Sequence, residues 1–140
     1  SSQLKIVGGY PVGSGENHDR NCSGDGWSYD GSTQTLTLDP STPTTYDLKE
    51  SGNIRQDQNS ILCSAIIEKN ATIVNGNFLG IDNPGPSITN YGTITSGTYS
   101  MPVINHGTIT GGTFLIPLPM TPLARLKMAR FFLPLPTTAP

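Results

Sequence analysis

Two rings and four hydroxyls at a fixed spacing are the side chains best suited to bind a ligand. Tyr91 and His106 occupy the same position, the second, in two successive copies of an Asn-x-Gly-Thr-Ile-Thr motif. Rings that stack at this spacing would offer a small planar surface to a sugar ring. The plainer interpretation of His106 is an exposed turn residue, because the only other histidine, His18, lies in a distant segment and completes no metal-ligand set.

The same motif places a threonine on each side of its isoleucine. Thr93 and Thr95 recur in the next copy as Thr108 and Thr110. Aligned hydroxyls of this kind are typical of ice-binding solenoids, whereas threonine also simply favours strands and solvates an exposed face. Val74 replaces the second threonine in the preceding copy, which leaves two copies with the full motif. We therefore expect these hydroxyls to contact a glycan together with the two rings, and we rank ice binding lower.

Charged side chains are scarce in this part of the chain. Asp82 is the only formally charged residue between positions 70 and 116. Enzymes that cleave polysaccharides need a general acid and a general base, usually two carboxyl groups. The repeats are therefore expected to bind without catalysis, and the alternative is a glycan-cleaving enzyme whose site lies outside them. No cofactor or metal is predicted, since the Asp-Gly pairs at Asp25 and Asp30 are more typical of turns than of a calcium loop.

The composition of the whole chain limits both fold and partners. The net charge of −2 gives no strong electrostatic affinity for nucleic acid. With 13% charged and 34% hydrophobic residues, 16 glycines and 12 prolines, short strands joined by turns are favoured over a helical globule. All ten acidic residues precede position 117, whereas the segment 117–140 contains Arg125, Lys127 and Arg130 and no acid.

Cys22 and Cys63 are the two cysteines, too few for a disulfide scaffold. They either form one disulfide in an oxidising compartment or remain as two free buried thiols. A disulfide would close a loop of about 40 residues and contribute a few kcal/mol at most. The sequence leaves both states open.

Three copies of one repeating unit occupy positions 67–78, 88–99 and 103–114. A Pro/Gly-rich loop, 79–86, separates the first copy from the second. Each copy has three apolar positions separated by Gly or Asn turns, and the expected columns are Ile67, Ile88 and Val103; Ile73, Ile94 and Ile109; and Phe78, Tyr99 and Phe114. Three short strands per copy predict a short β-solenoid with coils about 4.8 Å apart. An ordinary meander has no reason to keep such columns in register.

The segments on either side of the repeats differ from them. Residues 27–38 alternate around an Asp-Gly turn and predict a β-hairpin that caps the solenoid. Residues 40–60 are predicted to form a loop that leads to an apolar strand. We expect an all-β chain with three parts: an N-terminal cap and hairpin region (1–60), the solenoid repeats (61–116) and an irregular, proline-rich basic tail (117–140).

Gly26-Trp27-Ser28-Tyr29-Asp30, the Thr-Leu-Thr-Leu strand at 35–38 and the Asn-x-Gly-Thr-Ile-Thr-x-Gly-Thr-Phe/Tyr units carry a resemblance. Together they resemble repeat-containing surface proteins of Gram-positive gut-type bacteria, which are described as carbohydrate-binding-domain-like with β-helical stalks. The resemblance covers residues 26–38 and 66–114 and implies no residue roles. It implies an adhesive or structural module, secreted or on the bacterial cell surface, with a polysaccharide or host glycan as partner.

No transmembrane segment is predicted. The longest apolar run, 114–118, is broken by Pro117 and is too short to cross a bilayer.

Overall fold

The computed structural model describes residues 3–49, 54–56, 60–80 and 85–115, and within these ranges the chain is all-β with no helix. All of the described strands are two to four residues long, as expected where glycine and proline interrupt short threonine-rich runs. The strands are β1 (Leu4–Val7), β2 (Tyr10–Pro11), β3 (Cys22–Gly24), β4 (Trp27–Asp30), β5 (Thr35–Leu38), β6 (Thr44–Asp47), β7 (Ile54–Gln56), β8 (Ser64–Ile67), β9 (Ala71–Val74), β10 (Gly76–Leu79), β11 (Ile88–Asn90), β12 (Thr93–Ile94), β13 (Gly97–Ser100), β14 (Val103–Asn105), β15 (Thr108–Ile109) and β16 (Thr113–Phe114).

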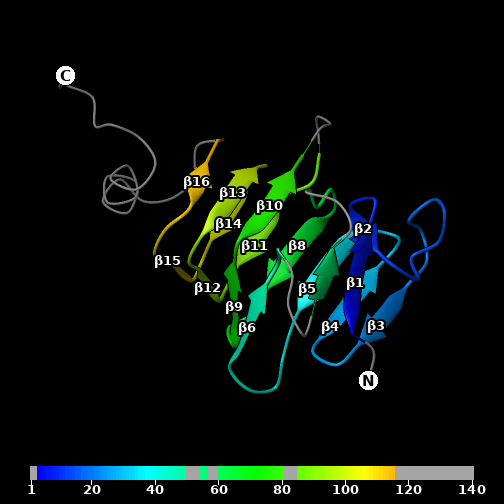
Figure 1. Ribbon diagram of the computed structural model, residues 1–140, viewed down its shortest axis with the longest axis horizontal. Coiled ribbons are helices and arrows are strands. Elements are labelled where there is room, and N and C mark those ends of the chain that lie inside the picture. The colour runs from blue at the N-terminus through cyan, green and yellow to red at the C-terminus, as the bar shows by residue number, and fades with distance from the viewer. Residues whose placement is uncertain (1–2, 50–53, 57–59, 81–84, 116–140) are drawn as a thin grey trace.

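Three sheets extend along the long axis of the molecule. In Figure 1 the colour of their strands runs from blue at one end to orange at the other. The hairpin sheet has the order β14-β11-β8-β5-β4-β3, the threonine sheet β15-β12-β9-β6, and the aromatic sheet β16-β13-β10. From β5, β6 and β10 onward, every pairing within these sheets is parallel. The last two passages of the chain each add one strand to all three sheets, first β11, β12 and β13 and then β14, β15 and β16.

Two of the three predicted apolar columns are confirmed by the strand register. They are Ile73, Ile94 and Ile109 in the threonine sheet, and Phe78, Tyr99 and Phe114 in the aromatic sheet. All six side chains are buried in one core cluster. The three aromatic rings stack with centroid separations of 5.7 and 4.9 Å, so ring contacts add to the burial of this column.

The third predicted column is wrong in its first member. Ile88 pairs with Ala65, whereas Ile67 lies opposite Asn90. The corner after β8 (68–71) is two residues longer than the equivalent corner after β11, so equal motif spacing does not give equal register. A shift of two residues preserves which side chains face inward, and Ile67 therefore remains fully buried.

The hairpin predicted for residues 27–38 is confirmed. Strands β4 and β5 pair in antiparallel fashion from Trp27 and Leu38 to Asp30 and Thr35. Strand β5 also pairs in parallel with β8, so the hairpin is continuous with the hairpin sheet, and β3 forms its N-terminal edge.

The loop predicted for residues 40–60 is wrong in part, because it contains β6 and β7. Strand β6 lies in parallel register with β9, and its inward Tyr46 donates a hydrogen bond to the Gly26 carbonyl at 2.9 Å. Pro43 directly precedes the strand and Pro40 lies three residues before Pro43, and the two prolines obscured the alternation in the sequence. The tail predicted for 117–140 lies outside the described residues.

A fourth, N-terminal sheet has the order β2-β1-β7, with β1 antiparallel to β2 and parallel to β7. Leu4 and Ile6 of β1 are fully buried in the same core cluster as the other sheets. Lys5 and Val7 alternate with them and are exposed on the opposite face. The N-terminal sheet therefore covers part of the core with one face and meets solvent with the other.

Candidate functional site

The two rings identified in the sequence lie at the corner between the hairpin and threonine sheets. Tyr91 follows β11, and His106 follows β14, the next strand of the same sheet. Their rings stack with centroids 5.2 Å apart and an interplanar angle of 13°. Tyr91 is 46% exposed and His106 is also exposed, so the stacked pair is accessible from solvent.

A ladder of asparagines beneath the rings holds the corner in place. Asn90 is fully buried, and its Nδ2 donates to Asn105 Oδ1 at 2.8 Å and to the carbonyls of Gly92 and Thr108. Its Oδ1 accepts from the Gly92 backbone N–H at 3.0 Å. Asn105 makes the equivalent pair of bonds to Gly107: its Nδ2 donates to the Gly107 carbonyl at 3.3 Å, and its Oδ1 accepts from the Gly107 backbone N–H at 3.2 Å. The polar atoms of a buried side chain are thus satisfied by the turns themselves, as buried amides require.

Glycine is required at these corners because successive passages of the chain approach closely. A Cβ on Gly92 would collide with the backbone carbonyls of Ala71 and Glu68, and one on Gly107 would collide with the carbonyl of Gly92. Backbone atoms cannot move aside as a flexible side chain can. The Asn-x-Gly spacing therefore fixes where Tyr91 and His106 project.

The threonines that follow the rings form a longer row than the sequence predicted. Thr93 lies in register with Thr108, as expected, and also with Thr72, which in turn pairs with Thr45. Thr72 and Thr93 are half-buried, whereas Thr45 and Thr108 are exposed. We name this four-residue line (Thr45, Thr72, Thr93, Thr108) the threonine row.

Two members of the row, Thr72 and Thr45, were not predicted from the sequence, for different reasons. Thr72 precedes an isoleucine as Thr93 does, but Val74 on its other side breaks the Thr-Ile-Thr pattern. Thr45 belongs to β6, in the segment predicted to be a loop. The available signal was the inward Tyr46 flanked by polar residues, since strict alternation is the mark of a half-buried strand.

A second line runs beside the row, one position beyond the inward isoleucines. Thr95 and Thr110 belong to it, and their backbone N–H groups donate to the carbonyls of Ile73 and Ile94. The Thr95 hydroxyl also donates to the Ile73 carbonyl at 3.1 Å, so this group is engaged within the protein. On the earlier strands β9 and β6 the corresponding positions are Val74 and Asp47, which pair with each other. The hydroxyl pattern is therefore continuous in the first line and partial in the second.

Asp47 is the one carboxylate among the residues of these two lines. Its Oδ1 accepts from Asn75 Nδ2 and from the Lys49 backbone N–H, both at 3.1 Å. A carboxylate bonded in this way stabilises the end of β6, and no second carboxylate of the two lines accompanies it.

The two cysteines are free thiols in the structure, which is one of the two states that the sequence left open. Cys63 is buried in the core, and burial raises its pKa to about 12. Cys22 is partly buried, its pKa is also raised by burial, and its Sγ lies 3.5 Å from the Val12 carbonyl. A thiol whose pKa is raised reacts slowly, because the thiolate is the nucleophile.

Comparison with known proteins gives no relative: no protein-family profile, curated protein or solved structure matches this chain. Among the described residues, no group of three or more His, Cys, Asp or Glu side chains is arranged to hold a metal ion. Nothing helical in that part of the chain has the length and apolarity that a membrane crossing requires.

Proposed function

We propose that this chain is a non-enzymatic binding module, a short β-solenoid whose exposed corner and threonine row contact an extended glycan. The observation that carries the proposal is the position of the stacked Tyr91–His106 pair, which directly precedes the strands that contribute Thr93 and Thr108. Ring faces and hydroxyls are the two kinds of group that suit a sugar, which has apolar C–H faces and polar edges.

The repeat of the fold favours a ligand that also repeats. Parallel strands lie about 4.8 Å apart, so the threonine row offers one hydroxyl per strand at a regular spacing. Each contact is weak by itself, because water competes for every hydroxyl. Affinity is therefore expected to be poor for a single sugar and to rise with ligand length or multivalent display.

Binding without turnover follows from the charge of the face. General acid–base hydrolysis needs two carboxyl groups at a fixed separation, and the two lines of the threonine sheet contribute Asp47 alone, already hydrogen-bonded to Asn75 and to the Lys49 backbone N–H. The resemblance to bacterial surface proteins supports a secreted or cell-surface adhesive role with a polysaccharide or host glycan as partner.

The test is a polysaccharide panel assayed for binding and for new reducing ends in parallel. Tyr91→Ala/His106→Ala and Thr93→Ala/Thr108→Ala should each weaken binding. Thr98→Ala/Thr113→Ala is the matched control, because these two threonines also pair in register on successive strands but lie on the aromatic sheet. Release of reducing ends by the wild-type protein would favour the glycan-cleaving alternative. Equal binding by all four proteins would remove the proposed site.

Ice binding is a second candidate, and the length of the threonine row favours it more than the sequence did. Four hydroxyls in register on one sheet form a regular array without charged members. Such a face could order water along the strand spacing. The measurement is inhibition of ice recrystallisation by the wild-type protein and by Thr72→Val/Thr93→Val, and inhibition that these substitutions leave unchanged would dismiss the candidate.

A further inference from the structure

We propose that a depression on the N-terminal sheet, remote in sequence from the threonine row, binds an oxyanion group such as a carboxylate or a phosphate. The depression has a volume of about 610 Å³ and lies between the outer face of β1 and the loop that joins β2 to β3. We name it the N-terminal depression. It is lined by Lys5, Val7, Pro11, Val12, Gly13, Ser14, Gly15, His18 and Arg20.

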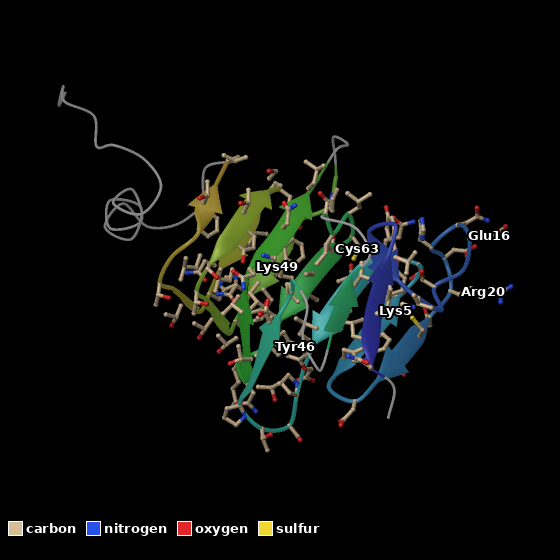
Figure 2. All side chains as sticks on the ribbon, in the orientation of Figure 1. Lys5, Glu16, Arg20, Tyr46, Lys49 and Cys63 are labelled. Carbon is tan, nitrogen blue, oxygen red and sulfur yellow. The ribbon has the colours of Figure 1, made fainter. Side chains whose placement is uncertain are left out.

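The charge of the lining is positive. Lys5 is directed outward because its neighbours Leu4 and Ile6 alternate into the core. Arg20 belongs to the loop and to the lining, and its alkyl chain passes over Gly15. Its side chain projects outward at the edge of the molecule, on the same loop as Glu16 (Figure 2). The described residues that line the depression include no carboxylate, although Glu16 and Asp19 of the same loop are exposed outside the lining.

His18 supplies the second, independent observation. Its Nδ1 is buried and has no hydrogen-bond partner. The ring stacks on Tyr10 with centroids 3.5 Å apart and an interplanar angle of 10°, which fixes its orientation. Buried polar atoms in folded proteins are almost always hydrogen-bonded, and leaving one unpaired is unfavourable. His18 also lines the depression, so an anionic oxygen that reached Nδ1 would satisfy a buried polar atom that the described part of the protein leaves unpaired.

The loop is held in one conformation before any ligand arrives. The Arg20 backbone N–H donates to the Ser14 carbonyl at 2.8 Å, and the Tyr29 hydroxyl donates to the His18 carbonyl at 2.8 Å. Burial raises the pKa of Tyr29, which keeps that hydroxyl protonated as a donor. Val12 is joined to β1 by its N–H, which donates to the Lys5 carbonyl at 2.7 Å. A site that is already formed needs little ordering on binding.

The arrangement favours an anion over a neutral sugar. Two exposed cations interact with an anion through solvent, and such pairs are weak and screened by salt. Binding should therefore be modest and should weaken as ionic strength rises. A neutral sugar would gain nothing from Lys5 or Arg20 as charges, and its binding would not depend on salt.

The experiment titrates the full chain with sodium phosphate, with glucuronate and with glucose, and follows backbone amide chemical shifts by NMR. Phosphate or glucuronate should shift the amides of residues 5–7 and 13–20, and these shifts should diminish in high salt. Lys5→Met and Arg20→Met keep the alkyl stems and remove the charges, and each should weaken binding about two- to fivefold. Lys49→Met and Lys69→Met, exposed lysines outside the depression, are the matched controls and should bind as the wild type does.

The results distinguish a general oxyanion site from a site for acidic sugars. Each way in which the proposal could fail also gives a different result. Shifts with both anions indicate a general oxyanion site, and shifts with glucuronate alone indicate the carboxylate of an acidic sugar. Glucose shifts equal to those of glucuronate would overturn the proposal, because charge would then be irrelevant. Equal weakening in the Lys49 and Lys69 controls would also overturn it, since net charge and not the depression would then govern binding. Unshifted amides at residues 5–7 and 13–20 with either anion would show that no such site exists.

Discussion

Asn90 donates a hydrogen bond from Nδ2 to Oδ1 of Asn105 at 2.8 Å, which joins two successive corners of the chain through their side chains. The same amide also accepts from the backbone N–H of Gly92 and donates to its carbonyl. One buried side chain thus satisfies the turn after its own strand and the side chain at the end of the next strand in the sheet. The position of Tyr91, and its stack with His106, depend on this bonding.

Asn90→Ala should therefore destabilise the fold by about 2–3 kcal/mol, because it leaves buried turn groups without partners. Asn105→Ala should cost less, since Asn105 is partly exposed and water can replace its bonds. Urea denaturation monitored by circular dichroism measures both changes. Equal losses of stability in the two variants would mean that burial of Asn90 does not increase the cost of removing its hydrogen bonds.

Ile94 is fully buried between Ile73 and Ile109, and Ile94→Ala should lower the free energy of unfolding by about 2–4 kcal/mol through lost burial and a residual cavity. Thr95→Ala removes one hydrogen bond from a half-buried hydroxyl and should cost about 1 kcal/mol. The two variants are adjacent and provide an internal comparison in urea melts. Similar losses at both positions would mean that the inward and outward side chains at Ile94 and Thr95 are misassigned.

The parts of the fold that the sequence predicted are those where apolar spacing repeats without interruption. Copies two and three follow one another at a constant offset, and their strands pair as the motif predicts. The hairpin at 27–38 was predictable because strict alternation surrounds an Asp-Gly turn. In these segments, local pattern and long-range pairing require the same register.

The sequence failed where a corner changed length or a proline preceded a strand. The two additional residues in the corner 68–71 move Ala65, and not Ile67, opposite Ile88. The strand β6 follows Pro40 and Pro43, which suggested a loop, yet its pairing with β9 supplies the ladder that a loop would lack. Local composition cannot reveal either feature, because both depend on which distant strand is the partner.

The candidate site, like the fold, could be predicted only in part from the sequence. The stacked pair and the threonines of β12 and β15 were visible as a motif, whereas Thr45 and Thr72 joined them only through strand register. The N-terminal depression had no sequence signal at all. Its lining comes from β1 and from a loop after β2, and a depression between them exists only in three dimensions.

The thiols give a prediction about pH. Burial raises the pKa of Cys63 from 9.0 to about 12, so deprotonation favours the unfolded chain, and stability should fall as pH rises from about 9 toward 12. Tyr29 and Tyr99 contribute in the same direction, because burial raises their pKa values as well. Below pH 9 all three groups are protonated in both states, and these groups produce no pH dependence there.

A labelling experiment isolates Cys63 from the tyrosines. At pH 8 iodoacetamide should modify Cys22 slowly in the folded protein and Cys63 only after unfolding in urea, as read by mass spectrometry of the two cysteine-containing peptides. Cys63→Ala is the control and should leave one modifiable site in urea. A protein from an oxidising compartment that resists labelling in urea without reductant would contain the Cys22–Cys63 disulfide instead of the free thiols.

The full threonine row and the shorter threonine motif of the sequence predict different effects for Thr72. Thr72 lies directly beside Thr93 in the row, although the sequence motif does not include it. If an extended ligand lies along the row, Thr72→Val should weaken polysaccharide binding about as much as Thr93→Val, because each removes one hydroxyl from the same line. The expected loss is a few-fold for each and should increase when both are replaced.

Valine preserves the β-branched shape, so the strand should be unaffected and the change is confined to the hydroxyl. Thr98→Val, on the aromatic sheet, is the matched control and should bind as the wild type does. Binding is measured by affinity electrophoresis in polysaccharide gels, with urea melts to verify that each variant folds. Weaker binding in Thr93→Val together with unchanged binding in Thr72→Val would restrict the site to the Tyr91–His106 corner and its nearest threonines. Weaker binding in Thr98→Val would mean that the ligand contacts more than one face, and the row would lose its special role.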